Sequence, residues 1–149
     1  MRFYVFAFFV ISLSILVWIT LKNEQSSVGE CTQANDTISK SHEEYLSQYG
    51  WHIKSKCNTS TEIVNYYPEQ IETLQTGGFN LEPYNNKGIE ATITSYRLIE
   101  KQQSGDTLSA TIVEIDGELV GGYGGLENWT PGIFSLDDKE RLLDEGIIE

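Results

Sequence analysis

The sequence has few basic residues. Lys and Arg together number 10, whereas Asp and Glu number 22, and the formal net charge at pH 7 is −12. Proteins that bind nucleic acid neutralise its phosphates with clustered Lys and Arg, and anionic membrane surfaces attract polybasic segments. We therefore expect neither a nucleic-acid partner nor a domain that lies flat on anionic lipid. An acidic surface favours solubility instead.

Residues that commonly carry catalysis are also scarce. The chain has two histidines, His42 and His52, and two cysteines, Cys31 and Cys57. The nucleophile elbow, the P-loop, the EF-hand and the paired-cysteine zinc motif are all absent from the sequence. We therefore predict a protein without catalysis, cofactor or metal ion. The alternative is an envelope-associated hydrolase or thiol enzyme, in which a polar cluster would form around His42, His52 or Cys57.

One apolar segment stands out in this polar chain. Residues 3–21 contain no charged side chain. About 20 residues in a helix span the roughly 30 Å hydrocarbon core of a bilayer. We predict a transmembrane anchor over residues 1–22 and a polar linker over residues 23–36. The alternatives are a cleaved signal peptide, although no small-x-small cleavage site follows the segment, and lipidation of Cys31, although a carboxylate precedes that residue.

The orientation of the anchor follows from the residues before it. Arg2 and the α-amino group favour a cytoplasmic N-terminus, and only two residues precede the apolar segment. We therefore predict a single-pass protein of the cell membrane with an extracytoplasmic C-terminal domain, whose partner would be an envelope protein or a cell-wall component. In that oxidising compartment Cys31 and Cys57 could form a disulfide. The alternative is two separate thiols.

Periodicity beyond the linker predicts a small α+β domain. Apolar and aromatic residues recur at three- and four-residue spacing over residues 37–49, as in an amphipathic helix ended by a glycine. A second helix is expected from Pro68, because the first helical turn tolerates proline, to the glycine pair at 77–78. Two short runs, 51–55 and 62–66, are typical of strands.

The longest strands are expected in the second half of the chain. Three alternating runs, the last two joined by an Asp-Gly turn, occupy residues 89–99, 107–115 and 118–123. The glycines at 121–125 are expected to end the last strand and to let the backbone approach a neighbour closely. We predict an antiparallel sheet of three to five strands with two helices packed on one face. The domain should cover residues 37–126, and residues 127–149 should form a C-terminal extension with a short helix.

The order of several short motifs resembles a known bacterial family. The motifs are Tyr45-Leu46 with Tyr49-Gly50-Trp51, Leu74-Gln75 with Gly78-Phe79-Asn80-Leu81-Glu82-Pro83-Tyr84, Tyr96-Arg97, and Asp116-Gly117 with Val120-Gly121-Gly122. Over residues 42–126 the chain is similar to the uncharacterised "domain of unknown function 4830" family, found mostly in Firmicutes and often membrane-anchored. The resemblance implies a membrane-anchored protein and brings no assigned activity or catalytic residue.

Aromatic side chains are frequent in the predicted loops. If several stay exposed together, they mark a partner or ligand surface, because Tyr and Trp supply much contact area at low entropic cost; the alternative is that they fill the core. The candidate contact residues are Tyr66, Tyr67, Tyr123 and Trp129. We therefore predict an acidic extracytoplasmic interaction or sensing domain. A small-ligand-binding domain with a cavity between helices and sheet is a further alternative.

Overall fold

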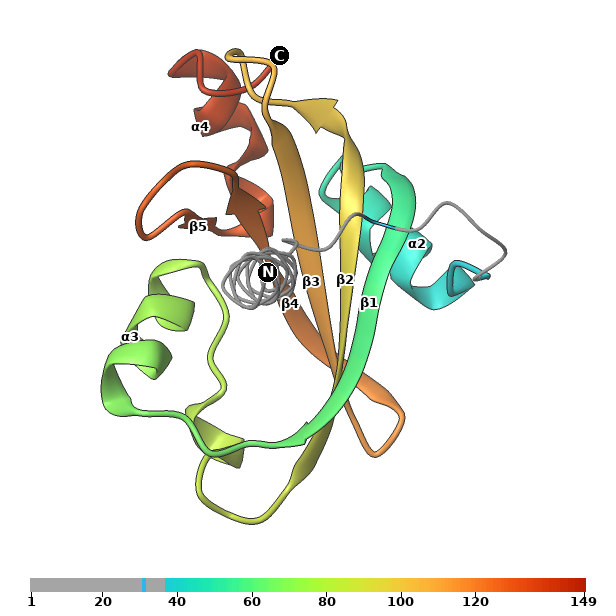
Figure 1. The fold of residues 1–149 in the computed structure, drawn as a ribbon, viewed down its shortest axis with the longest axis vertical. Helices are drawn as coiled ribbons and strands as arrows, with labels where there is room; N and C mark the ends of the chain where they lie inside the picture. The colour runs from blue at the N-terminus through green and yellow to red at the C-terminus, as the bar shows by residue number, and fades with distance from the viewer. Residues whose placement is uncertain (1–30, 32–36) are drawn as a thin grey trace, which may run out of the picture. The chain divides into compact units, whose positions relative to one another are not determined.

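The computed structural model describes Cys31 and residues 37–149 (Figure 1). The predicted anchor at residues 1–22 lies outside the described residues, and so does the predicted linker at residues 23–36 except for Cys31. Within the described part of the chain, no helix is both long enough and apolar enough to cross a membrane. Cys31–Glu149 forms a compact unit, and the following paragraphs concern that unit alone.

The described unit has α+β architecture, as predicted. Its α-helices are α2 (Lys40–Gln48), α3 (Pro68–Thr76) and α4 (Lys139–Asp144), with short 3-10 helices η1 (Glu82–Tyr84) and η2 (Leu136–Asp138). Its strands are β1 (Ile53–Ile63), β2 (Glu90–Lys101), β3 (Thr107–Ile115), β4 (Glu118–Leu126) and β5 (Ile133–Phe134).

The five strands form one antiparallel sheet in the order β1-β2-β3-β4-β5. Each strand therefore pairs with its neighbour in the sequence, as in a meander. Asp116 and Gly117 form the turn between β3 and β4, and both have positive φ, at 53° and 78°. A two-residue turn with positive φ at both positions matches the twist of antiparallel strands, so the predicted Asp-Gly hairpin is confirmed.

One prediction about the strands is wrong. The runs 51–55 and 62–66, predicted as two short strands, are joined in the single strand β1, which pairs with β2 over nearly its whole length. The polar residues 58–61 between the runs suggested a break in the sequence. They are exposed at the edge of the sheet, where polar Thr and Ser side chains are favourable in a strand. Register shifts lie between Ile53 and Ser55 and between Lys56 and Asn58.

Successive side chains along each strand point to opposite faces of the sheet, and the core is therefore divided into two clusters, one on each face. One face, here called the α2 face, packs against Leu46 of α2. The other, here called the α3 face, packs against Ile71 and Leu74 of α3. The buried sheet residues of the α2 face are Tyr96, Leu98, Leu108, Ala110 and Ile112, and those of the α3 face are Ala91, Val113 and Ile115.

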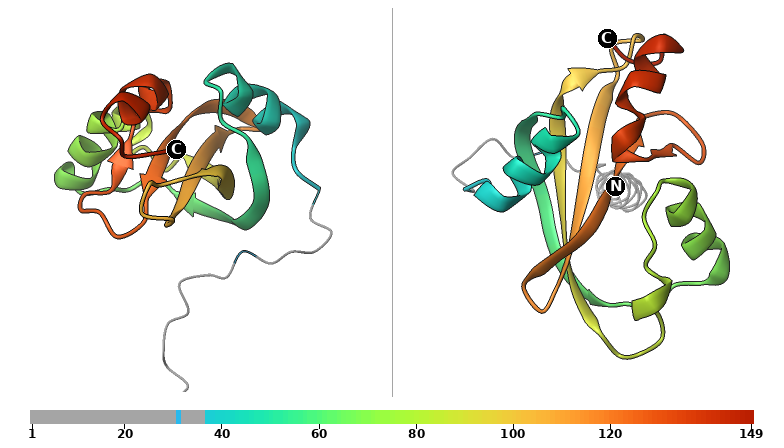
Figure 2. Two further views of the ribbon diagram at one scale, coloured as in Figure 1. Left: turned by 90° about the horizontal axis from the view of Figure 1, so that it is seen from above. Right: turned by 180° about the vertical axis from the view of Figure 1, so that it is seen from behind.

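The two predicted helices therefore cover opposite faces of the sheet and do not share one face as predicted. Helix α2 crosses behind the strands in the view of Figure 1 and in front of them in the reverse view of Figure 2. The physical reason lies in β3, where residues on both faces are apolar: Ala110 and Ile112 point to one side, and Val113 and Ile115 point to the other. A central strand with two apolar faces needs cover on both sides.

The C-terminal segment, predicted as an extension, contributes directly to the core of the α2 face. Phe134, Leu136, Leu142 and Ile148 are all buried in that cluster. The indole Nε1 of Trp51 donates a hydrogen bond of 2.7 Å to the carbonyl oxygen of Leu136. Helix α4 and the residues around it therefore close the α2 face together with α2.

Candidate functional site

A solvent-open pocket lies between α3 and the α3 face of the sheet. Its volume is about 340 Å³, at the lower end of the range of roughly 300–1,000 Å³ for small-molecule sites. Polar side chains of α3 line one side, and aromatic and aliphatic side chains line the rest. The lining residues are Tyr66, Glu69, Gln70, Thr73, Leu74, Tyr123 and Ile133.

Tyr66 is held in place through its backbone by the side chain of Asn85. The Tyr66 N–H donates to Asn85 Oδ1 at 2.8 Å, and Asn85 Nδ2 donates to the Tyr66 carbonyl oxygen at 3.0 Å. The amide side chain thereby replaces the strand neighbour that Tyr66 lacks after β1 ends. Pro68 then starts α3 two residues later, so the aromatic ring lies between the end of a strand and the start of a helix.

Tyr123 reaches the pocket from β4. It pairs with Thr111 of β3, and its ring is stacked on Phe79 with a centroid distance of 6.1 Å. Gly121 precedes it on the same side of the strand, and a Cβ at that position would lie 2.6 Å from Phe79 Cε2. The absence of a side chain at Gly121 therefore makes room for Phe79, which in turn supports the Tyr123 ring.

The apolar part of the pocket joins α3 to β5. Leu74 of α3 is 8% exposed, and Ile133 of β5 is partly buried against the same cluster. A Cβ at Gly77 would overlap Cγ2 of Ile133, so the end of α3 can approach β5 only because residue 77 is a glycine. The short strand β5, which the sequence did not predict, thus supplies part of the pocket wall.

A carboxylate is bonded to one tyrosine hydroxyl, and its charge also acts on the other tyrosine. The Tyr66 hydroxyl donates to a carboxylate oxygen of Glu62 at the end of β1. Burial raises the pKa of Tyr66, and the hydrogen bond to Glu62 raises it further. Burial also raises the pKa of Tyr123; a hydrogen bond with Thr111 opposes the shift, and the charge of Glu62 adds to it. Both phenols therefore remain neutral hydrogen-bonding groups at pH 7.

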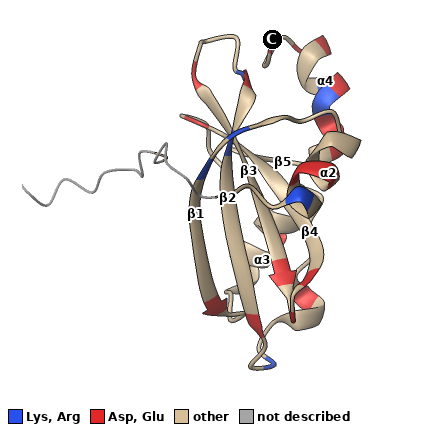
Figure 3. Ribbon diagram, turned by 90° about the vertical axis from the view of Figure 1, so that its right-hand side faces the viewer, with Lys and Arg blue, Asp and Glu red and all other residues tan. Residues whose placement is uncertain are grey.

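One end of the sheet is acidic, and its Glu62 is hydrogen-bonded to Tyr66 of the pocket lining. The register places Glu62 beside Ala91, Ile63 beside Glu90 and Ile115 beside Glu118, so acidic residues of three strands share one end. Figure 3 shows red segments gathered at that end of β1 and β4. Lys54, Lys56, Arg97 and Lys101 belong to the opposite halves of β1 and β2. The pocket meets the acidic end only through Glu62 and Tyr66, because Tyr123 pairs with Thr111 in the middle of β3 and Ile133 pairs with Gly125 in the other half of β4.

The structure brings together two of the four candidate contact residues. Tyr66 and Tyr123 line the pocket. Tyr67 is 75% exposed just before α3, and Trp129 is 53% exposed between β4 and β5; neither lines the pocket. The lining residues of α3 were not predicted, because the sequence does not show which side of an amphipathic helix borders an opening. The recurrence of polar side chains at Glu69 and Thr73, one turn apart, was the available signal.

The residues of the enzyme alternative lie in separate environments. His42 belongs to α2 and is buried against the sheet, where its Nδ1 is 2.7 Å from the Tyr96 hydroxyl. Its Nε2 is 3.3 Å from Glu114 Oε1, but the geometry does not make a hydrogen bond, and this nitrogen has no other partner in the described part of the chain. Cys57 is bonded to another cysteine and carries no free thiol. Among the described residues, no three His, Cys, Asp or Glu side chains are placed to hold a metal ion.

His52, the residue before β1, belongs to an ionic cluster with Glu100 of β2 and Lys139 of α4. Its Nδ1 is 2.8 Å from Glu100 Oε1, and Lys139 Nζ is 2.7 Å from the same oxygen. Lys139 also donates to the carbonyl oxygen of Gly50 and lies over the Trp51 ring, 4.6 Å from its centroid. These contacts give the cluster a structural role, because every charged group in it already has a partner.

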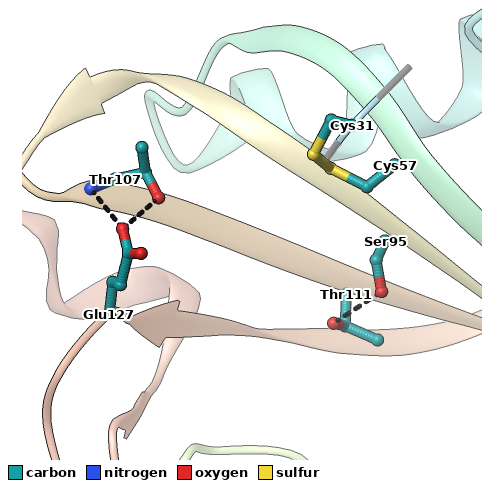
Figure 4. The surroundings of a disulfide bond; sticks show 6 residues. All are labelled: Cys31, Cys57, Ser95, Thr107, Thr111 and Glu127. Carbon is teal, nitrogen blue, oxygen red and sulfur yellow. Dashed lines mark hydrogen bonds between the residues drawn. A yellow bond between two sulfur atoms is a disulfide. The ribbon is translucent and has the colours of Figure 1, made fainter. Parts of the chain in front are cut away.

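Cys31 and Cys57 form a disulfide that attaches Cys31 to β1 (Figure 4). Cys57 lies at the irregularity between Lys56 and Asn58, and Asn58 pairs with Ser95 of β2. The Ser95 and Thr111 hydroxyls lie 3.4 Å apart on the neighbouring strands. The bond therefore ties the chain before α2 to the edge strand of the sheet.

Comparisons of the chain with models of protein families, with curated proteins and with solved structures give no match. The resemblance described from the motifs therefore stays a prediction, and the pocket is interpreted from its own geometry.

Proposed function

We propose that this chain is a single-pass membrane protein whose extracytoplasmic domain binds a small ligand, or a single side chain of an envelope partner, in the pocket between α3 and the sheet. The observation that carries the proposal is the pocket itself. It combines two tyrosines with an apolar floor and a few polar groups, which is the usual make-up of a binding site. The proposed domain binds and senses, without catalysis.

Two features support the extracytoplasmic location. The described part of the chain contains a disulfide, and disulfides persist in oxidising compartments but are rare in the cytosol. The uncharged residues 3–21 have the length of a membrane span. An acidic domain also suits an envelope partner that carries positive charge.

Filling the pocket tests the binding function. The full-length chain in lipid nanodiscs is titrated calorimetrically with benzylamine, benzyl alcohol and benzoate, which share one ring and differ in charge. Thr73→Trp places a large side chain in the pocket from α3, whereas Thr76→Trp on the same helix changes an exposed residue outside the lining. We expect at least one probe to bind with one-to-one stoichiometry, Thr73→Trp to weaken it more than tenfold and Thr76→Trp to leave it unchanged. If none binds, or if both variants bind like the parent, the pocket is not a binding site.

Protease treatment tests the location. Intact cells that express the full-length chain with a C-terminal epitope are exposed to an added protease, once the outer wall has been made permeable. We expect the epitope to disappear while a cytoplasmic marker protein stays intact. An epitope that survives until the membrane is dissolved would place the domain in the cytoplasm and contradict the proposal.

A further inference from the structure

We infer that the ligand of this pocket is a small organic cation, an ammonium group on a short apolar stem. The inference rests on the proposed binding function and adds the chemical class of the ligand. It follows from three properties of the pocket: the sign of its charges, its aromatic walls and the position of the nearest basic groups.

The charged groups at the pocket are negative. Glu69 is the charged side chain in the lining, and Glu62 accepts the hydrogen bond from the Tyr66 hydroxyl beside it. Among the described residues, the lining contains no Lys, Arg or His. A bound anion would therefore meet like charges, whereas an ammonium group would meet the carboxylates of Glu69 in the lining and of Glu62 beside Tyr66. Opposite charges in close contact attract each other even at a site that is open to solvent.

The aromatic walls favour the same ligand. A cation is attracted to the face of a tyrosine ring, and the attraction is strongest where water is excluded. Phe79 is stacked on one side of the Tyr123 ring and fixes its orientation. Leu74 and Ile133 supply apolar surface for the stem of the ligand. The pocket thus offers a negative rim and an apolar floor, which match the two ends of an alkyl- or arylammonium ion.

Two nearby features of opposite sign already have hydrogen-bond or charge partners. The N-terminus of α3 would by itself favour an anion, but Glu69 lies in its first turn and the Gln70 side chain accepts the Tyr67 N–H at 3.0 Å. Lys87 lies in the turn before β2, where its Nζ donates to the Pro83 carbonyl oxygen at 2.6 Å, and it is not part of the lining. The electrostatic preference of the pocket is therefore set by Glu62 and Glu69.

The three probes, which share one ring, also test the ligand class. In the full-length chain we expect benzylamine, a cation at pH 7, to bind at least tenfold more tightly than benzyl alcohol, and benzoate to give no measurable heat. Raising the salt concentration should weaken the binding of benzylamine and leave the binding of benzyl alcohol unchanged, because salt screens only the charged ligand. Glu62→Gln and Glu69→Gln should each lower the affinity for benzylamine three- to tenfold. The matched control is Glu43→Gln, an exposed carboxylate on α2 at the opposite face.

The outcomes separate the ligand class from the binding function. If benzyl alcohol or benzoate binds as tightly as benzylamine and Thr73→Trp abolishes that binding, the pocket binds ligands but the cation preference is overturned. If benzylamine binds and Glu62→Gln and Glu69→Gln lower its affinity no more than Glu43→Gln does, the attraction comes from the net charge of the chain. The inference is then equally overturned. If no probe binds, the ligand class falls together with the proposed function.

Discussion

At the scale of single residues, Glu100 shows how a few polar contacts connect distant parts of the chain. Its side chain is 11% exposed and accepts hydrogen bonds from Lys139 and His52, which are 39 and 48 residues away. Burial raises the pKa of Glu100, but the bonds from Lys139 and His52 outweigh it and hold the pKa below the ordinary value of 4.5. The ionised form of Glu100 therefore stabilises the folded state.

Glu100→Gln tests this stabilisation and its dependence on pH. We expect the free energy of unfolding at pH 7 to fall by about 1–3 kcal/mol, the usual range for lost hydrogen bonds to a charged group. A carboxyl with a lowered pKa stabilises the fold fully above the pKa of the unfolded chain and loses that effect as the pH falls. The difference between parent and variant should therefore shrink below about pH 4.5. This difference in unfolding free energy is measured by urea unfolding at several pH values, with tryptophan fluorescence as the signal.

The matched control for Glu100 is Glu140→Gln, which removes an exposed carboxylate from α4. It should change the unfolding free energy by less than about 0.5 kcal/mol at every pH, as exposed substitutions usually do. An equal loss in both variants would assign the effect to net charge. A loss in Glu100→Gln that stays constant down to pH 3 would assign it to packing.

Sequence reasoning could not have found this cluster. His52 and Glu100 each have unremarkable neighbours in the chain, and the pairing of β1 with β2 brings them together. Lys139 joins them only because α4 packs on the α2 face. The same holds for the pocket: aromatic enrichment identified Tyr66 and Tyr123, but their meeting with α3 depends on long-range packing.

At the scale of secondary structure, local patterns predicted most helices and turns correctly. Pro68 begins α3, Gly50 follows α2 with a φ of 79°, and the Asp116-Gly117 turn joins β3 to β4. These features depend on local backbone preferences, which a sequence carries directly. The extent of β1 was mispredicted because an edge strand needs apolar residues at only a few positions. Its polar middle therefore resembles a loop in the sequence. The two residues of β5 gave no periodic signal at all.

The glycines of β4 do not end the strand, which continues to Leu126. They do allow close approach, as predicted: a Cβ at Gly124 would overlap the Phe134 ring. We therefore expect Gly124→Ala to destabilise the fold by about 1–3 kcal/mol, the usual range for an overpacked core. Thermal unfolding monitored by circular dichroism gives the change.

A double-mutant cycle isolates the contact between Gly124 and Phe134. Phe134→Leu alone should destabilise the protein because it leaves a cavity beside Trp51, whose ring is 5.4 Å from that of Phe134. In the double variant the methyl group added at position 124 gains space, so the destabilisation should be smaller than the sum of the two single effects. Simple additivity would show that the alanine disturbs the backbone of β4 and not the packing of Phe134.

At the scale of the whole molecule, the class of the fold followed from composition and alternation, but the arrangement of its layers did not. An antiparallel sheet of up to five strands was predicted and is present. Which face each helix covers depends on residues such as Ile112 and Val113, adjacent in the chain and buried on opposite sides. A run of consecutive apolar residues shows that both faces are covered, but it does not assign a helix to either one.

The disulfide acts on the unit as a whole, since it closes a loop over a sequence separation of 26 residues that contains α2. A crosslink over a loop of this length stabilises a fold by about 3 kcal/mol, mainly by restricting the unfolded chain. We expect Cys31→Ser, Cys57→Ser and the double variant each to lose about that amount in urea unfolding of the full-length chain. Equal losses are the signature of a shared bond, because removing the second cysteine then has no further effect.

The same cysteines report the compartment. If the domain lies outside the cytoplasm, protein taken from cells with the thiols blocked at lysis should react with a polymer-linked maleimide only after a reductant has been added. A matched chain without residues 1–22, expressed in the cytoplasm, should react without reductant, because the cytosol keeps thiols reduced. Free thiols in the full-length chain would contradict the proposed location. A stability loss confined to Cys57→Ser would instead assign the contribution to local packing in β1, so the two measurements separate the role of the bond from the place where it forms.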